Sequence, residues 1–414
     1  MSTIVSTARA NWRTPLLILA CGAAFAAITF GPRSSMGLFL APLSSDLGWG
    51  RDVFALAIAI QNLLWGLGQP FAGAVADRFG ATRVLAAGAL LYAAGLFWMA
   101  FAQSPGELHL SAGVLIGFGL SGCSFNIVLG AFGKLLPPER RPLAFGIGTA
   151  AGSFGQFFFA PLGAALISSV GWQNALIAFG CFLLLILPLS LVLATPRIID
   201  ASPLPGIQKQ SIRQALGEAF AERSYVLLVL GFFTCGFQLA FITTHLPPYL
   251  ADIGLDPWIG GWTIAVIGLA NIVGSLSSGY LSGRVSKVWL LVVIYALRGV
   301  AIAVFILLPP SPVTAIGFGI AIGFLWLSTI PPTSGLVVVM FGTGYMTMLY
   351  GFAFFSHQVG AFLGVWLGGI LYEAYGSYDL VWWLAVALSF ASAAINMPIR
   401  ERPVARLSGA PAAA

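Results

Sequence analysis

The sequence predicts an all-α polytopic membrane protein whose twelve transmembrane helices form two six-helix halves. Three observations predict it: the composition, the apolar runs and an internal repeat. Hydrophobic residues make up 59% of the 414 residues and charged residues only 8%, whereas soluble domains carry about 25% charged residues. A soluble chain of this composition would have too few polar side chains to cover its surface.

The expected spans are apolar runs of about 20 residues, bounded by proline, glycine and charge. They lie at 15–41, 52–76, 82–102, 108–133, 142–168, 172–195, 225–250, 258–282, 288–308, 313–337, 345–372 and 377–398. We expect the first to be retained as a span, because it is too long for a signal peptide and no small-residue cleavage site follows it.

The basic residues predict the orientation. With the N-terminus inside, 16 of the 19 Lys and Arg residues fall in cytoplasmic segments, Arg51 alone falls in an outer loop, and Arg33 and Arg298 fall within spans. The positive-inside rule therefore places both termini in the cytoplasm. The net charge of +6 is explained by topology and indicates no nucleic-acid partner. The scarcity of lysine and the Ala, Gly and Arg bias suggest a bacterial inner membrane.

The longest loop divides the chain into an N-terminal half (1–195), a cytoplasmic linker (196–224), a C-terminal half (225–398) and a cytoplasmic tail (399–414). The segment 211–223 has apolar residues on one helical face, which predicts a short helix on the inner membrane surface. An unstructured linker is the alternative. The last nine residues, RLSGAPAAA, are predicted to lack regular structure.

The two halves share residues at a constant offset of 206 positions. The clearest run pairs Leu40, Pro42, Asp46 and Gly48 with Leu246, Pro248, Asp252 and Gly254, and Gly73 and Arg78 pair with Gly279 and Arg284. Transporters built from such repeats carry their substrate site near the membrane midplane, between the repeats.

The loop after the second span reads 73-GAVADRFGATR-83 and resembles the signature of the major facilitator superfamily. The resemblance implies that fold, and it implies that Asp77 and Arg78 act in gating on the cytoplasmic side. The second half retains the pattern only in part, as 279-GYLSGRVSK-287, with Gly283 at the place of the acid.

Two further stretches, 30-FGPRSSMGLFL-40 and 140-RRPLAFGIGTAAGSFG-155, resemble the bacterial branch of the monocarboxylate transporter family. This narrower resemblance implies an organic-anion substrate. The family's eighth span carries an Asp and an Arg, where this sequence has Asn271 and Ser275. The departure leaves proton coupling open.

Arg33 is the leading candidate for substrate binding. All 13 acidic residues fall in loops or at span ends, so Arg33 has no carboxylate partner within the membrane. An intramembrane cation marks a functional site, and a guanidinium binds a carboxylate through two parallel hydrogen bonds. The alternative is bonding to backbone carbonyls. Arg298, in the peripheral ninth span, is expected to bond helix carbonyls or to hold a neighbouring helix.

Other polar residues in the spans complete the candidate sites. His357 either carries a proton or donates to a neighbouring helix, and His245 either belongs to an outer gate or is a satisfied interfacial histidine. Pro331 and Pro332 free backbone carbonyls in the tenth span and predict a gating hinge. The remaining candidates, each a substrate contact or an interhelical bond, are Asn126, Gln156, Gln238, Asn271 and Gln358.

The sequence carries no phosphate-binding loop, catalytic grouping or metal-ligand spacing, so we expect no enzyme, cofactor or metal. It predicts a monomeric secondary transporter of a small organic anion, foremost a monocarboxylate, working by alternating access. Protons are one candidate coupling partner, and the direction of transport is left open. Two alternatives remain: proton-antiport efflux of a drug or metabolite, and a non-transporting sensor with the transporter fold.

Overall fold

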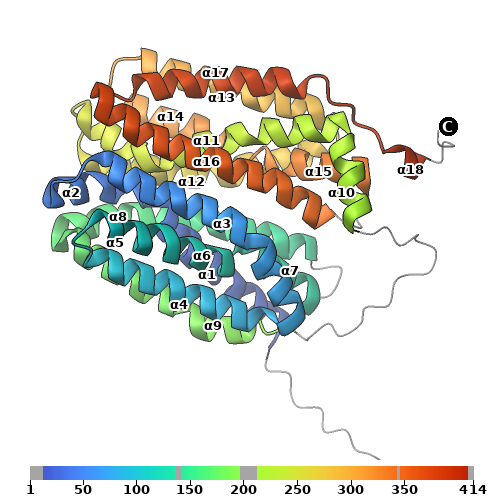
Figure 1. Cartoon of the computed structure of the whole chain (residues 1–414), viewed down its shortest axis with the longest axis horizontal. Coiled ribbons are helices and arrows are strands. Elements are labelled where there is room, and N and C mark those ends of the chain that lie inside the picture. The colour runs from blue at the N-terminus through green and yellow to red at the C-terminus, as the bar shows by residue number, and fades with distance from the viewer. Residues whose placement is uncertain (1–12, 137–140, 196–211, 343–345, 409–414) are drawn as a thin grey trace, which may run out of the picture.

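The computed structural model describes residues 13–136, 141–195, 212–342 and 346–408. Its helices run along the long axis of the molecule, with the N-terminal half on one side and the C-terminal half on the other (Figure 1). Every regular element in these residues is helical.

The N-terminal half contains the first six predicted spans. Its elements are α1 (Pro15–Ser34), α2 (Gly37–Leu47), α3 (Arg51–Phe79), α4 (Ala81–Ala100), α5 (Pro105–Leu108), the π-helical turn η1 (His109–Leu115), α6 (Ile116–Gly122), α7 (Phe125–Leu135), α8 (Arg141–Leu184) and α9 (Ile186–Val192). The chain reverses within α8 at Gly171, whose φ of 84° is a left-handed conformation that glycine adopts without strain. The two arms of α8 are therefore separate spans.

The linker helix α10 precedes the C-terminal half, which contains the other six spans. The elements from the linker onward are α10 (Ile212–Ala221), α11 (Arg223–Asp252), α12 (Pro257–Ser282), α13 (Lys287–Leu307), α14 (Pro312–Leu325), α15 (Ile330–Phe341), α16 (Met346–Tyr375), α17 (Asp379–Asn396) and α18 (Ala405–Ser408). Helix α10 falls where the amphipathic pattern predicts it, and its location on a membrane surface stays a prediction.

The structure confirms the all-helical, multi-span prediction. Ten helices of the described residues are long and apolar enough to cross a membrane. One of them, Ala150–Val192, has 43 residues and covers two predicted spans on either side of Gly171. Helix α3 adds 29 residues, or about 44 Å at 1.5 Å per residue.

Four spans are interrupted in the described residues. The first breaks between α1 and α2, the fourth between α6 and α7, the sixth between α8 and α9, and the tenth between α14 and α15. The tenth-span break precedes Pro331 and Pro332, as their positions predict. The fourth-span break, at Cys123–Ser124, lies 206 residues before the end of the tenth-span break, so the two halves are interrupted at corresponding places. No proline marks it in the sequence, and it was not predicted.

The two halves meet along three helix pairs, α3 with α16, α8 with α12, and α2 with α11 (Figure 1). Glycines permit the closest approaches. A Cβ added to Gly369 of α16 would lie 2.4 Å from the Cβ of Ala55, and one added to Gly37 of α2 would lie 2.1 Å from the backbone oxygen of Thr243. Both contacts lie toward the end of the molecule where α3 begins, here called the Arg51 end.

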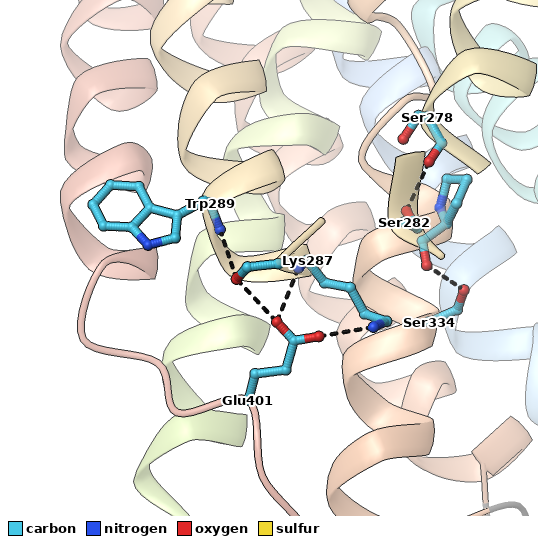
Figure 2. Close-up of polar contacts among 8 residues, drawn as sticks. Ser278, Ser282, Lys287, Trp289, Ser334 and Glu401 are labelled. Carbon is cyan, nitrogen blue, oxygen red and sulfur yellow. Dashed lines mark hydrogen bonds and ion pairs between the residues drawn. The ribbon is translucent and has the colours of Figure 1, made fainter. Parts of the chain in front are cut away.

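At the opposite end, called the Lys287 end, the chain after α17 packs against its own half. Glu401 accepts hydrogen bonds from Lys287 through Nζ at 2.7 Å and through the backbone nitrogen at 2.9 Å (Figure 2). The backbone nitrogen of Val404 donates to the oxygen of Met340 at 3.0 Å. An acid from the tail thus pairs with the last basic residue of 279-GYLSGRVSK-287, the motif copy that has lost its own acid.

The tail beyond residue 405 corrects one expectation. Residues Ala405–Ser408 form the short helix α18, and Arg406 pairs with Glu218 of α10 at 3.1 Å. The predicted lack of regular structure is therefore wrong for these residues. The ion pair supplies the reason, because it ties the tail to the linker helix. Residues 409–414 lie outside the described part of the chain.

Candidate substrate-binding site and gates

Arg33 lies in the last turn of α1, beside the first-span break. Its Nη2 donates to Oδ1 of Asn62 on α3 at 2.7 Å, and its Cζ lies 4.5 Å from the centroid of the Trp65 ring. Its Nε is buried without a hydrogen-bond partner, and the ion pairs of the described residues do not include Arg33. The guanidinium therefore keeps an unused donor and no counter-charge, which suits it to bind an anion.

A row of rings leads from Arg33 across to the C-terminal half. The Trp65 ring meets Phe354 of α16 edge-on at 5.4 Å between centroids, and Phe354 stacks on His357 at 5.6 Å. His357 is 8% exposed, and its Nδ1 lies 3.2 Å from Oε1 of Gln358. Arg33 and His357, one from each half, are thus the two ends of a single row of contacts.

Gln358 lies at the same interface between α3 and α16. A Cβ added to Gly66 of α3 would lie 2.7 Å from the Cβ of Gln358, so the two helices are close here. The Gln358 side chain is fully buried, and its Nε2 has no hydrogen-bond partner. The structure therefore gathers three of the predicted site residues, Arg33, His357 and Gln358, about the α3–α16 interface.

Gln156 and Asn271 join the halves at the α8–α12 interface instead. Gln156 Nε2 donates to the oxygen of Ile264 at 3.0 Å, and Asn271 Nδ2 donates to Oγ of Ser153 at 2.9 Å. Asn271 Oδ1 also accepts from the backbone nitrogen of Leu327, in the tenth-span break, at 2.9 Å. These bonds are interhelical, one of the two roles that the sequence left open.

The last two polar candidates differ from each other in surroundings. Gln238 is fully buried and donates to the oxygen of Ala385 at 2.9 Å and to Ser389, so it links α11 to α17 within one half. Asn126 is exposed in the first turn of α7, directly after the fourth-span break. Asn126 therefore has a side chain free to meet a ligand, whereas Gln238 is occupied by helix packing.

Arg298 closes the tenth-span break from α13. The side chain is fully buried, and its Nε and Nη2 donate to the oxygen of Leu325 at 3.1 and 2.7 Å. Its Nη2 also donates to the oxygen of Trp326. These oxygens end α14 and lack helical partners, so Arg298 bonds helix carbonyls and neutralises the negative end of the helix.

Four residues from both halves form a cluster at the Arg51 end, here called the Arg51 cluster: Arg51, Asp252, Glu373 and Tyr378. Nη1 and Nη2 of Arg51 bind Asp252 at 2.5 and 2.7 Å, and its backbone nitrogen donates to Oε1 of Glu373 at 2.6 Å. Nη1 of Arg51 also donates to the Tyr378 hydroxyl at 3.2 Å. His245, fully buried, lies beside the cluster with Nδ1 3.2 Å from that hydroxyl.

The other predicted gating residues are only partly described. Pro331 and Pro332 lie in the first turn of α15, where the missing backbone donors cost the helix nothing. The side chains of Asp77 and Arg78 lie outside the described part of the structure, so their gating role stays a prediction.

Sequence reasoning missed the residues that surround the predicted ones. Asn62 and Trp65 were detectable, because 61-QNLLW-65 places two polar amides and an indole within an apolar run. The partners of Arg51 were harder to find. Their separations of 201 and 327 positions from Arg51 carry no local signal.

A helical membrane protein in two repeated halves, with discontinuous spans at corresponding places, has the architecture of a secondary transporter. The chain matches the family model described as Major Facilitator Superfamily over residues 19–365. It belongs to that superfamily and is a transporter of that class.

The chain is also similar, at modest identity, to individual transporters. The chain is 26% identical to the Uncharacterized MFS-type transporter YcxA of Bacillus subtilis, over 88% of this chain and 90% of YcxA. It is 25% identical to Monocarboxylate transporter 13 of Rattus norvegicus, over 89% and 85% of the two chains, and 28% identical to Monocarboxylate transporter 11 of Mus musculus, over 86% and 81%.

Solved structures share the fold. A bacterial homologue of the human lysosomal transporter Spinster, in its inward-facing and unoccupied conformation, matches with a TM-score of 0.72 and 17% identity, over 93% of this chain and 98% of that one. A D-xylose–proton symporter matches with a TM-score of 0.70 and 14% identity, over 94% and 99%.

Proposed function

We propose that this protein carries a small organic anion, foremost a monocarboxylate, across the membrane by alternating access. Arg33 binds the carboxylate. His357 and Gln358 form the facing part of the site from the other half. The relatives named monocarboxylate transporters support this substrate class.

The observation that carries the proposal is the state of Arg33. The guanidinium has a buried Nε without a partner, a single bond to a neutral amide and no counter-charge in the described ion pairs. A carboxylate supplies both the missing charge and two acceptor oxygens. The rings of Trp65 and Phe30, at 4.5 and 5.8 Å from Arg33 Cζ, provide apolar walls for a short carbon chain.

The Arg51 end faces the outside in this proposal, and both chain termini lie in the cytoplasm. The distribution of basic residues supports that orientation. The named contacts between the halves run from the Arg51 cluster to the middle of the spans, whereas Lys287–Glu401 and Arg406–Glu218 stay within one half. In this orientation the described contacts correspond to a state that is closed on the outside.

The test is uptake of labelled carboxylates into proteoliposomes, with and without an inward proton gradient. Arg33→Ala should lower uptake by roughly 10- to 100-fold, because a hydrogen-bonded charge pair contributes about 1.5–3 kcal/mol. Arg33→Lys should recover only part of the uptake, because an ammonium cannot form two parallel bonds to a carboxylate.

Arg213→Ala is the matched control, since Arg213 is exposed on α10 and should transport normally. Normal uptake by Arg33→Ala would remove the proposal. So would a parent protein that takes up no carboxylate, whether or not the proton gradient is present. Efflux by proton antiport would then be examined first.

A further inference from the structure

His245 is held by two hydrogen bonds between α11 and its neighbours. Its Nε2 lies 2.8 Å from the oxygen of Val365 on α16, and its Nδ1 lies 3.2 Å from the hydroxyl of Tyr378. That hydroxyl receives Nη1 of Arg51, which in turn binds Asp252. A buried imidazole is thus connected through one phenol to the ion pair that joins the two halves.

The bonding selects one tautomer of the neutral imidazole in this conformation. A backbone oxygen only accepts, so in the neutral ring Nε2 carries the hydrogen and Nδ1 is the acceptor. Nδ1 accepts from the Tyr378 hydroxyl, whose oxygen accepts from Arg51. A phenol has an ordinary pKa of about 10, so it keeps the hydrogen that it donates. When His245 is neutral, every hydrogen that takes part in the bonds from Arg51 through Tyr378 and His245 to Val365 has an acceptor.

Adding a proton to His245 breaks this pattern. Nδ1 then becomes a donor, the Tyr378 oxygen faces two donors, and the phenol hydrogen loses its acceptor. The imidazolium would also be buried beside the Arg51 cation, whose pairing with Asp252 is already complete. A buried charge without its own partner is strongly unfavourable.

The groups around His245 offer no ready compensation. Glu373 is engaged by the backbone nitrogen of Arg51, and the His245 ring packs against Gly368, Phe241 and Tyr378. Toward the Arg51 end, the elements packed about it carry the following charged and titratable groups: Asp46 of α2, Arg51 and Asp52 of α3, Tyr249 and Asp252 of α11, Tyr372, Glu373 and Tyr375 of α16, and Tyr378 and Asp379 before and at the start of α17.

We propose that His245 is a proton-binding site that controls the opening of the Arg51 end. A proton binds His245 more tightly when this end is open and the ring reaches water. Acid on that side therefore shifts the population toward the open state, since a ligand favours the conformation that binds it better. Taken with the proposed orientation, external acid makes the outward-facing state more populated without any proton having to cross the membrane.

The experiment measures the opening directly. Spin labels at Gln103→Cys and Pro310→Cys, exposed positions at the Arg51 end of each half, report the distance between the halves in the full-length reconstituted protein. The background carries Cys181→Ser, because Cys181 is the exposed native cysteine and the others are buried. Between about pH 8 and about pH 5, the range of histidine titration, the longer distance should gain population as pH falls.

The open-to-closed ratio should rise by up to tenfold, roughly, per pH unit inside that window. His245→Gln keeps a donor for Val365 but cannot titrate, so its distance distribution should not change with pH. His109→Gln is the matched control: His109 is the other histidine at this end, and it contacts the oxygen of Val53 within its own half at 3.1 Å. It should respond as the parent does.

Tyr378→Phe provides a second variant that keeps the histidine. It removes the clash between donors at the phenol oxygen but leaves His245 buried near Arg51, so it should weaken the pH response without abolishing it. A parent protein whose distances do not change with pH, or a His245→Gln variant that responds like the parent, overturns the proposal. Titration of Asp252 or Glu373 would be recognised by its persistence in His245→Gln and would overturn it as well.

The distance measurement needs no substrate, so its outcome is separable from the transport assay. A pH response lost in His245→Gln, together with absent carboxylate uptake, would remove the proposed substrate and leave the proton site standing. Arg33-dependent uptake together with a distance that does not change with pH would support the proposed substrate and remove the proton site.

Discussion

Arg298 illustrates how a single residue can keep a cation inside a span without an acidic partner. Its charge is met by the two oxygens that end α14, so the side chain repairs the helix break that the following prolines create. Arg33 has the same chemistry but only a neutral amide as a partner. Each keeps one buried nitrogen without a partner, but Arg298 is engaged by helix carbonyls, whereas the binding of a ligand by Arg33 stays a proposal.

Arg298→Met should lower the melting temperature in detergent, because it leaves the oxygens of Leu325 and Trp326 buried and unpaired. Each such oxygen costs about 1–3 kcal/mol. Arg298→Lys should be intermediate, since one ammonium cannot reproduce the planar fork. Arg213→Met on the exposed face of α10 is the control. An unchanged melting temperature in Arg298→Met would show that the brace contributes nothing to stability.

At the scale of elements, the tail after α17 fastens three parts of the C-terminal half together. Glu401 binds the start of α13, Val404 binds the end of α15, and Arg406 binds the linker helix α10. Burial would raise the pKa of Glu401, but the bonds from Lys287 and Ser286 outweigh it and leave that pKa below its usual value. The carboxylate is therefore kept charged by its partners.

Glu401→Gln should loosen the tail and speed hydrogen exchange over residues 399–408. Because the folded-state pKa is depressed, the contribution of Glu401 is full above the ordinary carboxyl range and is lost as pH falls through the depressed value. Exchange in the parent should therefore rise, relative to the variant, only at acid pH. Arg402→Gln changes an exposed neighbour and should leave exchange unaltered. Equal protection in parent and Glu401→Gln at neutral pH would contradict the role.

At the scale of the whole molecule, the two halves approach each other closely at glycine positions toward the Arg51 end. Gly369 faces Ala55 and Gly37 faces the backbone of Thr243, so these contacts close only while the positions stay small. The Arg51 cluster adds charge pairing on top of that fit.

Gly369→Leu should hold the Arg51 end open, because its side chain has no room in the closed arrangement. The spin-label pair described above should show the longer distance at every pH, and uptake should fall for lack of an inward-facing state. Gly317→Leu is the control, since a Cβ at Gly317 meets nothing within 4 Å. A parent-like distance distribution in Gly369→Leu would contradict this prediction, because it would mean that α3 and α16 accommodate the larger side chain while the Arg51 end stays closed.

Much of the fold followed from the sequence, because each span carries its own signal of length, hydrophobicity and flanking charge. The break before Pro331 also has a local signal in the sequence, the two prolines. The break at Cys123–Ser124 has no such signal, since it depends on packing and on the cap that Ser124 provides to α7.

The candidate site was predicted by charge and only partly by geometry. Arg33 was chosen as a candidate because a cation in an apolar run is costly. The ring pair Trp65–Phe354 was missed because it joins residues from different halves. Gln238 was indistinguishable from a ligand contact in sequence, since a buried amide looks the same whether its partner is a helix carbonyl or a substrate.

The repeat offers one more lesson, in the fate of two aspartates that occupy equivalent positions. Asp46 accepts from Trp172 and Gln173 of its own half, whereas Asp252 reaches across to Arg51. The aspartate of the first half thus connects elements of a single half. Its counterpart in the second half takes part in a contact that exists only while the two halves meet at the Arg51 end.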